Sequence, residues 1–133
     1  MEFSALETGF DLGELRIVVS AAANERYWRA AGADHSALRA GVLYPPIAAN
    51  LTVLLFGESC AEPVIQTAQR LRCHRAADAP AELVATGRVV ACYEKRDREY
   101  VDLEVAVSTG DSPDVLWDSA VTFTPAATLR MAT

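Results

Sequence analysis

Long runs of alternating apolar and polar residues fill the second half of the chain. In EYVDLEVAVS (99–108), the valines and the leucine are expected on one face of a strand, and Tyr100, Asp102 and Glu104 on the other. Residues 64–74, 81–95 and 115–124 are also rich in strand-forming residues. RAADAP, KRDR and TGDSPD lie between these segments and are typical of turns. The pattern therefore predicts a series of long antiparallel strands after Pro63.

The first half of the chain predicts a short strand and two helices. GELRIVVS (13–20) is rich in β-branched residues and predicts the strand, after an irregular lead-in over residues 1–13. Ser20 suits the N-cap of the first helix, SAAANERYWRAAGA, and Gly32 suits the position after its last turn.

The second helix is predicted to be the apolar centre of the fold. Pro45 and Pro46 suit its first turn, where a missing N–H costs nothing. Its sequence is IAANLTVLLFGES, and Gly57 is expected to end it. The residues expected on its core face are Ile47, Leu51, Leu54 and Leu55, with Val53 and Phe56 widening that face. A helix this apolar is expected to be buried on most sides.

These elements predict an α+β fold in which a curved antiparallel sheet wraps around a central apolar helix. The 133 residues (1–133) are expected to form a single domain, and the apolar half of the composition can supply its core. Gly87 lies inside a predicted strand and indicates a bulge or close packing at that point.

The charge and the cysteines narrow the classes of function. A net charge of −6 disfavours a nucleic-acid binder, although a few local arginines could still bind an anionic ligand. The three cysteines lack C-x-x-C spacing, so we expect no metal, no cofactor and no disulfide framework. The N-terminus has no basic region before an apolar run, and the longest such run, LTVLLF, is too short to span a bilayer. We therefore expect a cytoplasmic protein without a membrane partner.

Three stretches match the motifs of one family in order and spacing. NERYWRAAGADHSAL is similar to a helix followed by a G-D-x-N-P-x-H loop, and GVLYPPIAANL to the start of a central helix. HRAADAPAELVATGRVVACYEKRDREYVDLEVAV is similar to a strand pair with the patterns G-D-x-L-x-x-x-G-x-V and K-R-G-x-x-Y-V-x-V. Together they cover most of the chain, which resembles the MaoC-like branch of the hot-dog fold. That branch includes (R)-specific enoyl-thioester hydratases and 3-hydroxyacyl-thioester dehydratases.

The resemblance implies an acyl thioester substrate, on coenzyme A or acyl carrier protein, with water added or removed at its C2–C3 bond. In this family an Asp and a His in the loop before the central helix form the catalytic pair, and Asp34 falls on that Asp. Backbone N–H groups at the start of the central helix polarise the thioester carbonyl. Here they correspond to Ile47, Ala48 and Ala49, since the first N–H groups of a helix have no partner within it.

The loop departs from the family pattern at the position of the base. Ser36 and Ala37 replace Asn and Pro, Arg39 stands where the His is expected, and the stretch to the proline pair is shorter than usual. Arginine stays protonated at neutral pH and cannot act as a general base. Either His35 replaces the base beside Asp34, or the chain is a non-catalytic subunit, or the site serves a related addition, cyclisation or hydrolysis. Arg39 is then a partner of Asp34, a ligand for an anionic group or a solvated loop residue.

The favoured interpretation is an acyl-thioester hydratase or dehydratase with Asp34 and His35 as its catalytic pair, in polyketide or fatty-acyl metabolism. The alternative is a non-catalytic hot-dog subunit that pairs with a catalytic one. A hot-dog thioesterase is third, because the central helix offers only Asn50 and Glu58 to aim at a thioester. We expect a dimer with a second copy or a related subunit, since a lone sheet edge and the acyl tunnel need completion.

Other residues are candidates for substrate binding. Tyr44 either lines the acyl tunnel or packs, and Asn50 is either a structural hydrogen-bonding residue or a site residue. Arg72 and His74 alternate with Arg70 along one predicted strand and so share a face. They could contact the phosphates of coenzyme A or form a solvated face.

Overall fold

The elements of the fold follow the predicted order. The structure is a computed structural model that describes residues 1–32, 36 and 41–126. Its elements are η1 (Phe3–Ala5), β1 (Asp11–Val19), α1 (Ala21–Ala31), α3 (Ile47–Ser59), β2 (Val64–Cys73), β3 (Ala81–Lys95), β4 (Arg98–Thr109) and β5 (Val115–Pro125). The α+β class is confirmed. β1 begins earlier than expected, within the segment that was predicted to be irregular.

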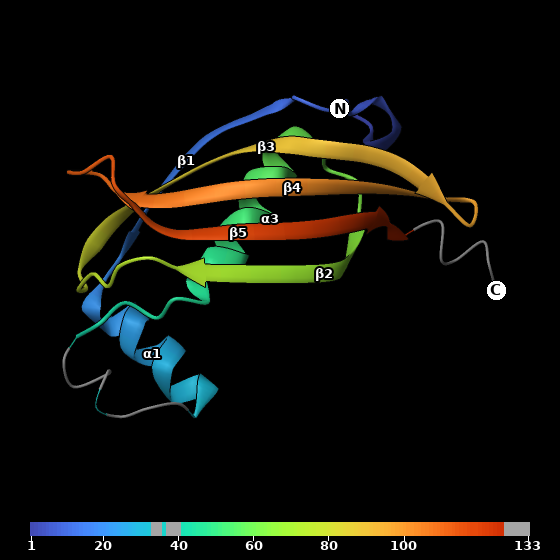
Figure 1. The fold of residues 1–133 in the computed structure, drawn as a ribbon. Coiled ribbons are helices and arrows are strands. Elements are labelled where there is room, and N and C mark those ends of the chain that lie inside the picture. The colour runs from blue at the N-terminus through green and yellow to red at the C-terminus, as the bar shows by residue number, and fades with distance from the viewer. Residues whose placement is uncertain (33–35, 37–40, 127–133) are drawn as a thin grey trace.

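The five strands form one antiparallel sheet in the order β1-β3-β4-β5-β2. Figure 1 shows the sheet curving over α3, which crosses one face of it, while α1 lies beyond one end. We call the face against α3 the inner face and the opposite one the outer face. This arrangement confirms the prediction of a curved sheet around a central apolar helix. In the part of the chain that the structure describes, β1 and β2 are the two edge strands.

The alternation in β4 is also confirmed. Val101, Leu103, Val105 and Val107 are each at most 2% exposed, and they point to the inner face. The buried side chains of α3 oppose them. These are Ile47, Ala48, Leu51, Thr52, Leu55 and Phe56.

Two expectations for α3 are wrong. Gly57 does not end the helix, which continues to Ser59. Leu54 and Val53, which were expected on the core face, are 52% and 46% exposed. The physical reason is that a nearly uniform apolar sequence has no polar face to fix the rotation of the helix. The packing against the sheet sets that rotation instead.

The two ends of α1 form as predicted. The Ser20 hydroxyl accepts a hydrogen bond from the Ala23 N–H at 3.1 Å, which satisfies one free donor of the first turn. Gly32 follows the helix with φ of 63°, in the left-handed region that glycine tolerates best. Within residues 1–32, 36 and 41–126, every helix is too short or too polar to cross a membrane.

Candidate functional site

The predicted catalytic loop lies in the sequence between α1 and the segment that leads into α3. Asp34, His35 and Arg39 lie outside the described residues, so their predicted roles stay predictions. The segments that flank the loop in the sequence are described: the end of α1, and residues 41–46, which lead into α3.

The first turn of α3 is tightly wound. The amides of Ile47, Ala48 and Ala49 donate to the carbonyls of residues 44, 45 and 46 at 3.1, 3.1 and 3.0 Å. These bonds span three residues, as in a 3₁₀ turn, and they correct the expectation that the amides have no partner. The side chains of Ile47 and Ala48 are buried in the core. A ligand oxygen at this helix start would have to share these amides with the turn.

An aromatic cluster lies beside the start of α3. The Tyr44 ring stacks on Tyr27 with centroids 6.0 Å apart and meets Trp28 edge to face at 4.9 Å. Asn50, one turn into α3, is exposed, and its side-chain amide donates to the Tyr27 hydroxyl at 3.4 Å. Tyr44 and Asn50 are thus linked through Tyr27, as parts of one cluster between α1 and α3.

A hollow of about 290 Å³ opens at the same end of the fold. Leu43 and Pro45 line it from the segment before α3, and Cys73 and His74 line it from the end of β2. Trp117 of β5 forms another part of its wall. The structure therefore brings His74 to the same hollow as Leu43 and Pro45, in the segment before α3, although these residues lie far from it in sequence.

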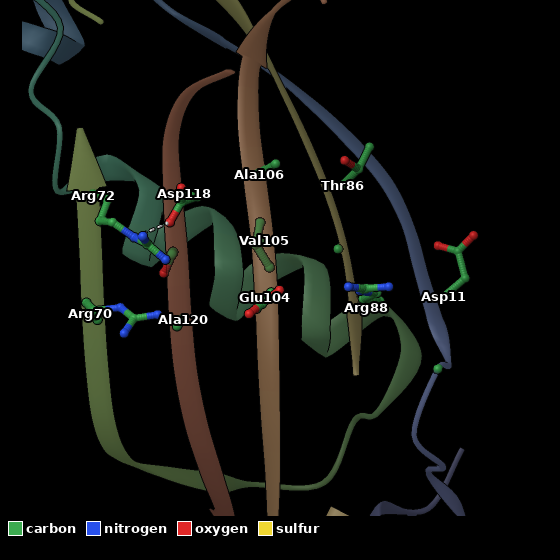
Figure 2. A pocket seen from close by; sticks show the side chains of 13 residues that line it. Asp11, Arg70, Arg72, Thr86, Arg88, Glu104, Val105, Ala106, Asp118 and Ala120 are labelled. Atoms are coloured by element: carbon green, nitrogen blue, oxygen red, sulfur yellow. Dashed lines mark ion pairs between the residues drawn. The ribbon is translucent and has the colours of Figure 1, made fainter. Parts of the chain in front are cut away.

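Arg72 contacts the same carboxylate as His74, that of Asp118. It pairs with Asp118 across the β2–β5 ladder, and its Nε lies 3.3 Å from Asp118 Oδ1. Figure 2 shows this pair on the outer face, with α3 behind the strands. Nε2 of His74 lies 2.5 Å from Asp118 Oδ2. The hydrogen bond from His74, assisted by the charge of Arg72, lowers the pKa of Asp118 below its ordinary value, against the opposing effect of burial.

A larger hollow, of about 560 Å³, lies on the outer face (Figure 2). Arg70, Arg72 and Arg88 line it together with three carboxylates, those of Asp11, Glu104 and Asp118. Among the described residues, neither Arg70 nor Arg88 forms an ion pair. Equal numbers of cations and anions line this hollow, so its charge favours no single class of ligand.

Two residues of these surroundings were not predicted from the sequence. Asp118 was missed because its partner His74 is 44 positions away and the pairing of β2 with β5 was not foreseen. Asn24 was missed because it reads as an ordinary helical residue, yet it is 2% exposed and bonds to the backbone of Val42 and Tyr44. A polar residue on the apolar side of α1 was the one signal for it.

Known structures share this arrangement, although no protein-family model and no curated protein sequence matches the chain. The C-terminally truncated HadBC (3R-hydroxyacyl-ACP dehydratase) complex from Mycobacterium tuberculosis matches with a TM-score of 0.75 and 16% identity, over 88% of this chain and 96% of that one. The (R)-hydratase from A. caviae involved in PHA biosynthesis matches with a TM-score of 0.72 and 16% identity, over 90% of this chain and 96% of that one. The MaoC-like dehydratase from Rhodospirillum rubrum matches with a TM-score of 0.70 and 19% identity, over 94% of this chain and 96% of that one.

These likenesses cover nearly the whole of each chain, at identities that establish the fold rather than the chemistry. The chain therefore has the hot-dog fold of the MaoC-like hydratases and dehydratases that its sequence resembles.

Proposed function

We propose that this chain is an acyl-thioester hydratase or dehydratase that acts at the C2–C3 bond, with Asp34 and His35 as its catalytic pair. The observation that carries the proposal is the likeness of fold to an (R)-hydratase and a 3R-hydroxyacyl-ACP dehydratase over nearly the full chain. The retained Asp34 and the apolar hollow at the start of α3 support it. Arg72, Tyr44, Asn50 and His74 remain proposed contacts of the substrate.

The chemistry assigns each proposed residue a task. In hydration, His35 removes a proton from a water that Asp34 holds, the water oxygen bonds to C3, and the protonated His35 returns that proton to C2. The negative charge that develops on the thioester oxygen needs donors. The first-turn amides of α3 can serve only by sharing, and such three-centre bonds are common at helix ends. Dehydration is the reverse of this sequence.

Turnover of defined thioesters tests the proposal. The purified protein is incubated with crotonyl and 3-hydroxybutyryl thioesters of coenzyme A and of acyl carrier protein, and hydration is followed by loss of the enoyl absorbance. Asp34→Ala and His35→Ala are each expected to lower the rate by roughly 100-fold or more. Turnover that survives both substitutions contradicts this catalytic pair. Release of free thiol without hydration would favour a thioesterase.

A non-catalytic partner subunit is the second candidate. Arg39 at the position of the family base and the already bonded amides of Ile47 to Ala49 both favour it. The similar HadBC structure is itself a complex. In this case the pure chain is inactive, and activity returns when a co-purifying hot-dog subunit is added.

In either case we propose pairing with a second hot-dog subunit. Among the described strands, β2 pairs only with β5 and leaves its other edge open. Val53 and Leu54 of α3 add exposed apolar surface of the kind that subunit interfaces bury. A cytoplasmic location also stays a proposal, which the three unpaired cysteines support.

A further inference from the structure

The segment that leads into α3 is hydrogen-bonded along both of its sides. On one side, the Leu43 N–H donates to the Ala77 carbonyl at 2.8 Å, and the Ala79 N–H donates to the Gly41 carbonyl at 2.9 Å. Val42 forms an antiparallel bridge with Asp78 between these bonds. Val42 therefore forms an isolated antiparallel bridge with the loop that precedes β3, and the bonds of Gly41 and Leu43 flank it.

The other side of this segment is held by side chains of α1 rather than by a strand. The Asn24 side-chain N–H donates to the Val42 carbonyl at 2.9 Å, and its side-chain oxygen accepts the Tyr44 N–H at 2.8 Å. Trp28 Nε1 donates to the same Val42 carbonyl at 2.7 Å. The Asn24 amide thus bonds to backbone groups two residues apart, as a neighbouring parallel strand would.

The burial of Asn24 makes these bonds strong constraints. Asn24 is 2% exposed, and a buried amide that loses its partners has no water to replace them. Tyr44 is fixed both at its backbone by Asn24 and at its ring by Tyr27 and Trp28. The Tyr44 carbonyl in turn accepts the first amide bond of α3, from Ile47.

We propose that Asn24, assisted by Trp28, is a positioning residue that fixes Tyr44 and the start of α3 for binding of the acyl thioester. The inference rests on the proposed function for its substrate. Asn24 does not touch the reacting atoms in this proposal and acts through Tyr44. Displacement of Tyr44 is expected to alter binding of the acyl group before it alters the stability of the sheet.

Three variants separate this role from a purely structural one. Asn24→Ala removes both side-chain bonds, whereas Asn24→Asp keeps an acceptor for the Tyr44 N–H and loses the donor to Val42. Thr52→Val is the matched control, because Thr52 is fully buried and, among the described residues, its hydroxyl bonds within α3 alone, to the Ala48 carbonyl at 2.8 Å. It removes a buried hydrogen bond without touching the segment 41–44.

The first readout is hydrogen exchange of the Tyr44 amide, followed by NMR under native conditions. Asn24→Ala is expected to speed this exchange by roughly 10-fold or more, Asn24→Asp to speed it less, and Thr52→Val to leave it unchanged relative to other core amides. Equal acceleration in Asn24→Ala and Thr52→Val overturns the inference. Unchanged Tyr44 exchange in Asn24→Ala overturns it as well.

The second readout is the kinetics of crotonyl-CoA hydration. Asn24→Ala is expected to raise KM by roughly 10-fold with a smaller change in kcat, and Asn24→Asp to restore part of the loss. Equal KM values in wild type and Asn24→Ala overturn the role of Asn24 in substrate binding. If the wild-type protein turns over no thioester, the proposed function fails, and the exchange of the Tyr44 amide decides alone whether Asn24 positions Tyr44.

Discussion

Gly87 of β3 packs so closely on Val105 of β4 that a Cβ atom on Gly87 would lie 2.7 Å from Val105 Cγ2. The same atom would lie 2.8 Å from the Glu104 carbonyl oxygen and 3.4 Å from Leu12 Cδ1. Gly87 and Val105 are direct partners in the β3–β4 ladder. The glycine therefore lets β1, β3 and β4 pack closely at the inner face, which is one of the two alternatives, a bulge or close packing, that the sequence indicated there.

Gly87→Ala is expected to destabilise the protein by about 1–3 kcal/mol, because the added methyl overpacks a rigid core. Gly57→Ala is the matched control: Gly57 lies in α3 with nothing within 4 Å of its would-be Cβ. There, alanine is expected to stabilise by up to about 1 kcal/mol through helix propensity. Urea unfolding measures both free energies. Equal effects of the two substitutions would contradict the close-packing account.

The strands could be predicted from the sequence because their residues alternate. In β4 each inner residue is apolar and most outer neighbours are polar, so the period of two fixes both the element and its buried face. The N-cap residue and the glycine that flank α1 likewise predict where the helix begins and ends. These are local signals, and they hold without knowledge of the tertiary structure.

The features that the sequence did not predict correctly depend on long-range packing. Leu54 and Leu55 are chemically identical neighbours, yet one is 52% exposed and the other fully buried, which only the placement of α3 on the sheet decides. The Asp118–His74 pair needs the β2–β5 register, and the Asn24 bonds need α1 to lie beside residues 42–44. The amides at the start of α3 were expected to be free. Their bonds belong to a tight turn that includes the two prolines, and hydrophobic periodicity does not reveal such a turn.

The pairing of Asp118 with His74 and Arg72 predicts a dependence of stability on acidic pH. Because the folded pKa of Asp118 is lowered, its stabilising effect is fully present above the ordinary Asp pKa and is lost as pH falls through the folded pKa. The difference in Tm between wild type and Asp118→Asn is therefore expected to shrink as pH falls from about 4 to 2. Thermal scans at stepped pH measure it.

Asp114→Asn is the control for this pH series. Asp114 contacts Arg75 at 3.6 Å, and its side chain is 69% exposed, so this pair contributes little at any pH. We expect the Tm of Asp114→Asn to equal that of the wild type at every pH of the series. If the difference in Tm between wild type and Asp118→Asn stays constant down to pH 2, the charge of the Asp118 carboxylate does not contribute to the stability of the fold.

The exposed apolar residues of α3 predict an interface. Leu54→Lys is expected to weaken self-association at least about 10-fold, because it places a charge in a contact that would otherwise bury an apolar side chain. Val18→Lys is the matched control, since Val18 is 68% exposed but lies on the edge strand β1 rather than on α3. Sedimentation velocity over a concentration series measures both. A monomeric wild type rules out the homodimer, and dissociation by Val18→Lys places the interface elsewhere.

Residue 39 offers a gain-of-function test of the family resemblance. Arg39 stands where a MaoC-like enzyme has its catalytic His, so Arg39→His restores a base of suitable pKa at that position. If the loop holds this residue as the family does, hydration of crotonyl-CoA is expected to rise by roughly 10-fold or more. Arg26→His, which adds a histidine on the exposed side of α1, is expected to leave the rate unchanged. If Arg39→His hydrates crotonyl-CoA at the wild-type rate and His35→Ala loses that activity, the general base is His35. No turnover in any of these proteins, followed by activity in the presence of a second subunit, assigns the chemistry to the partner.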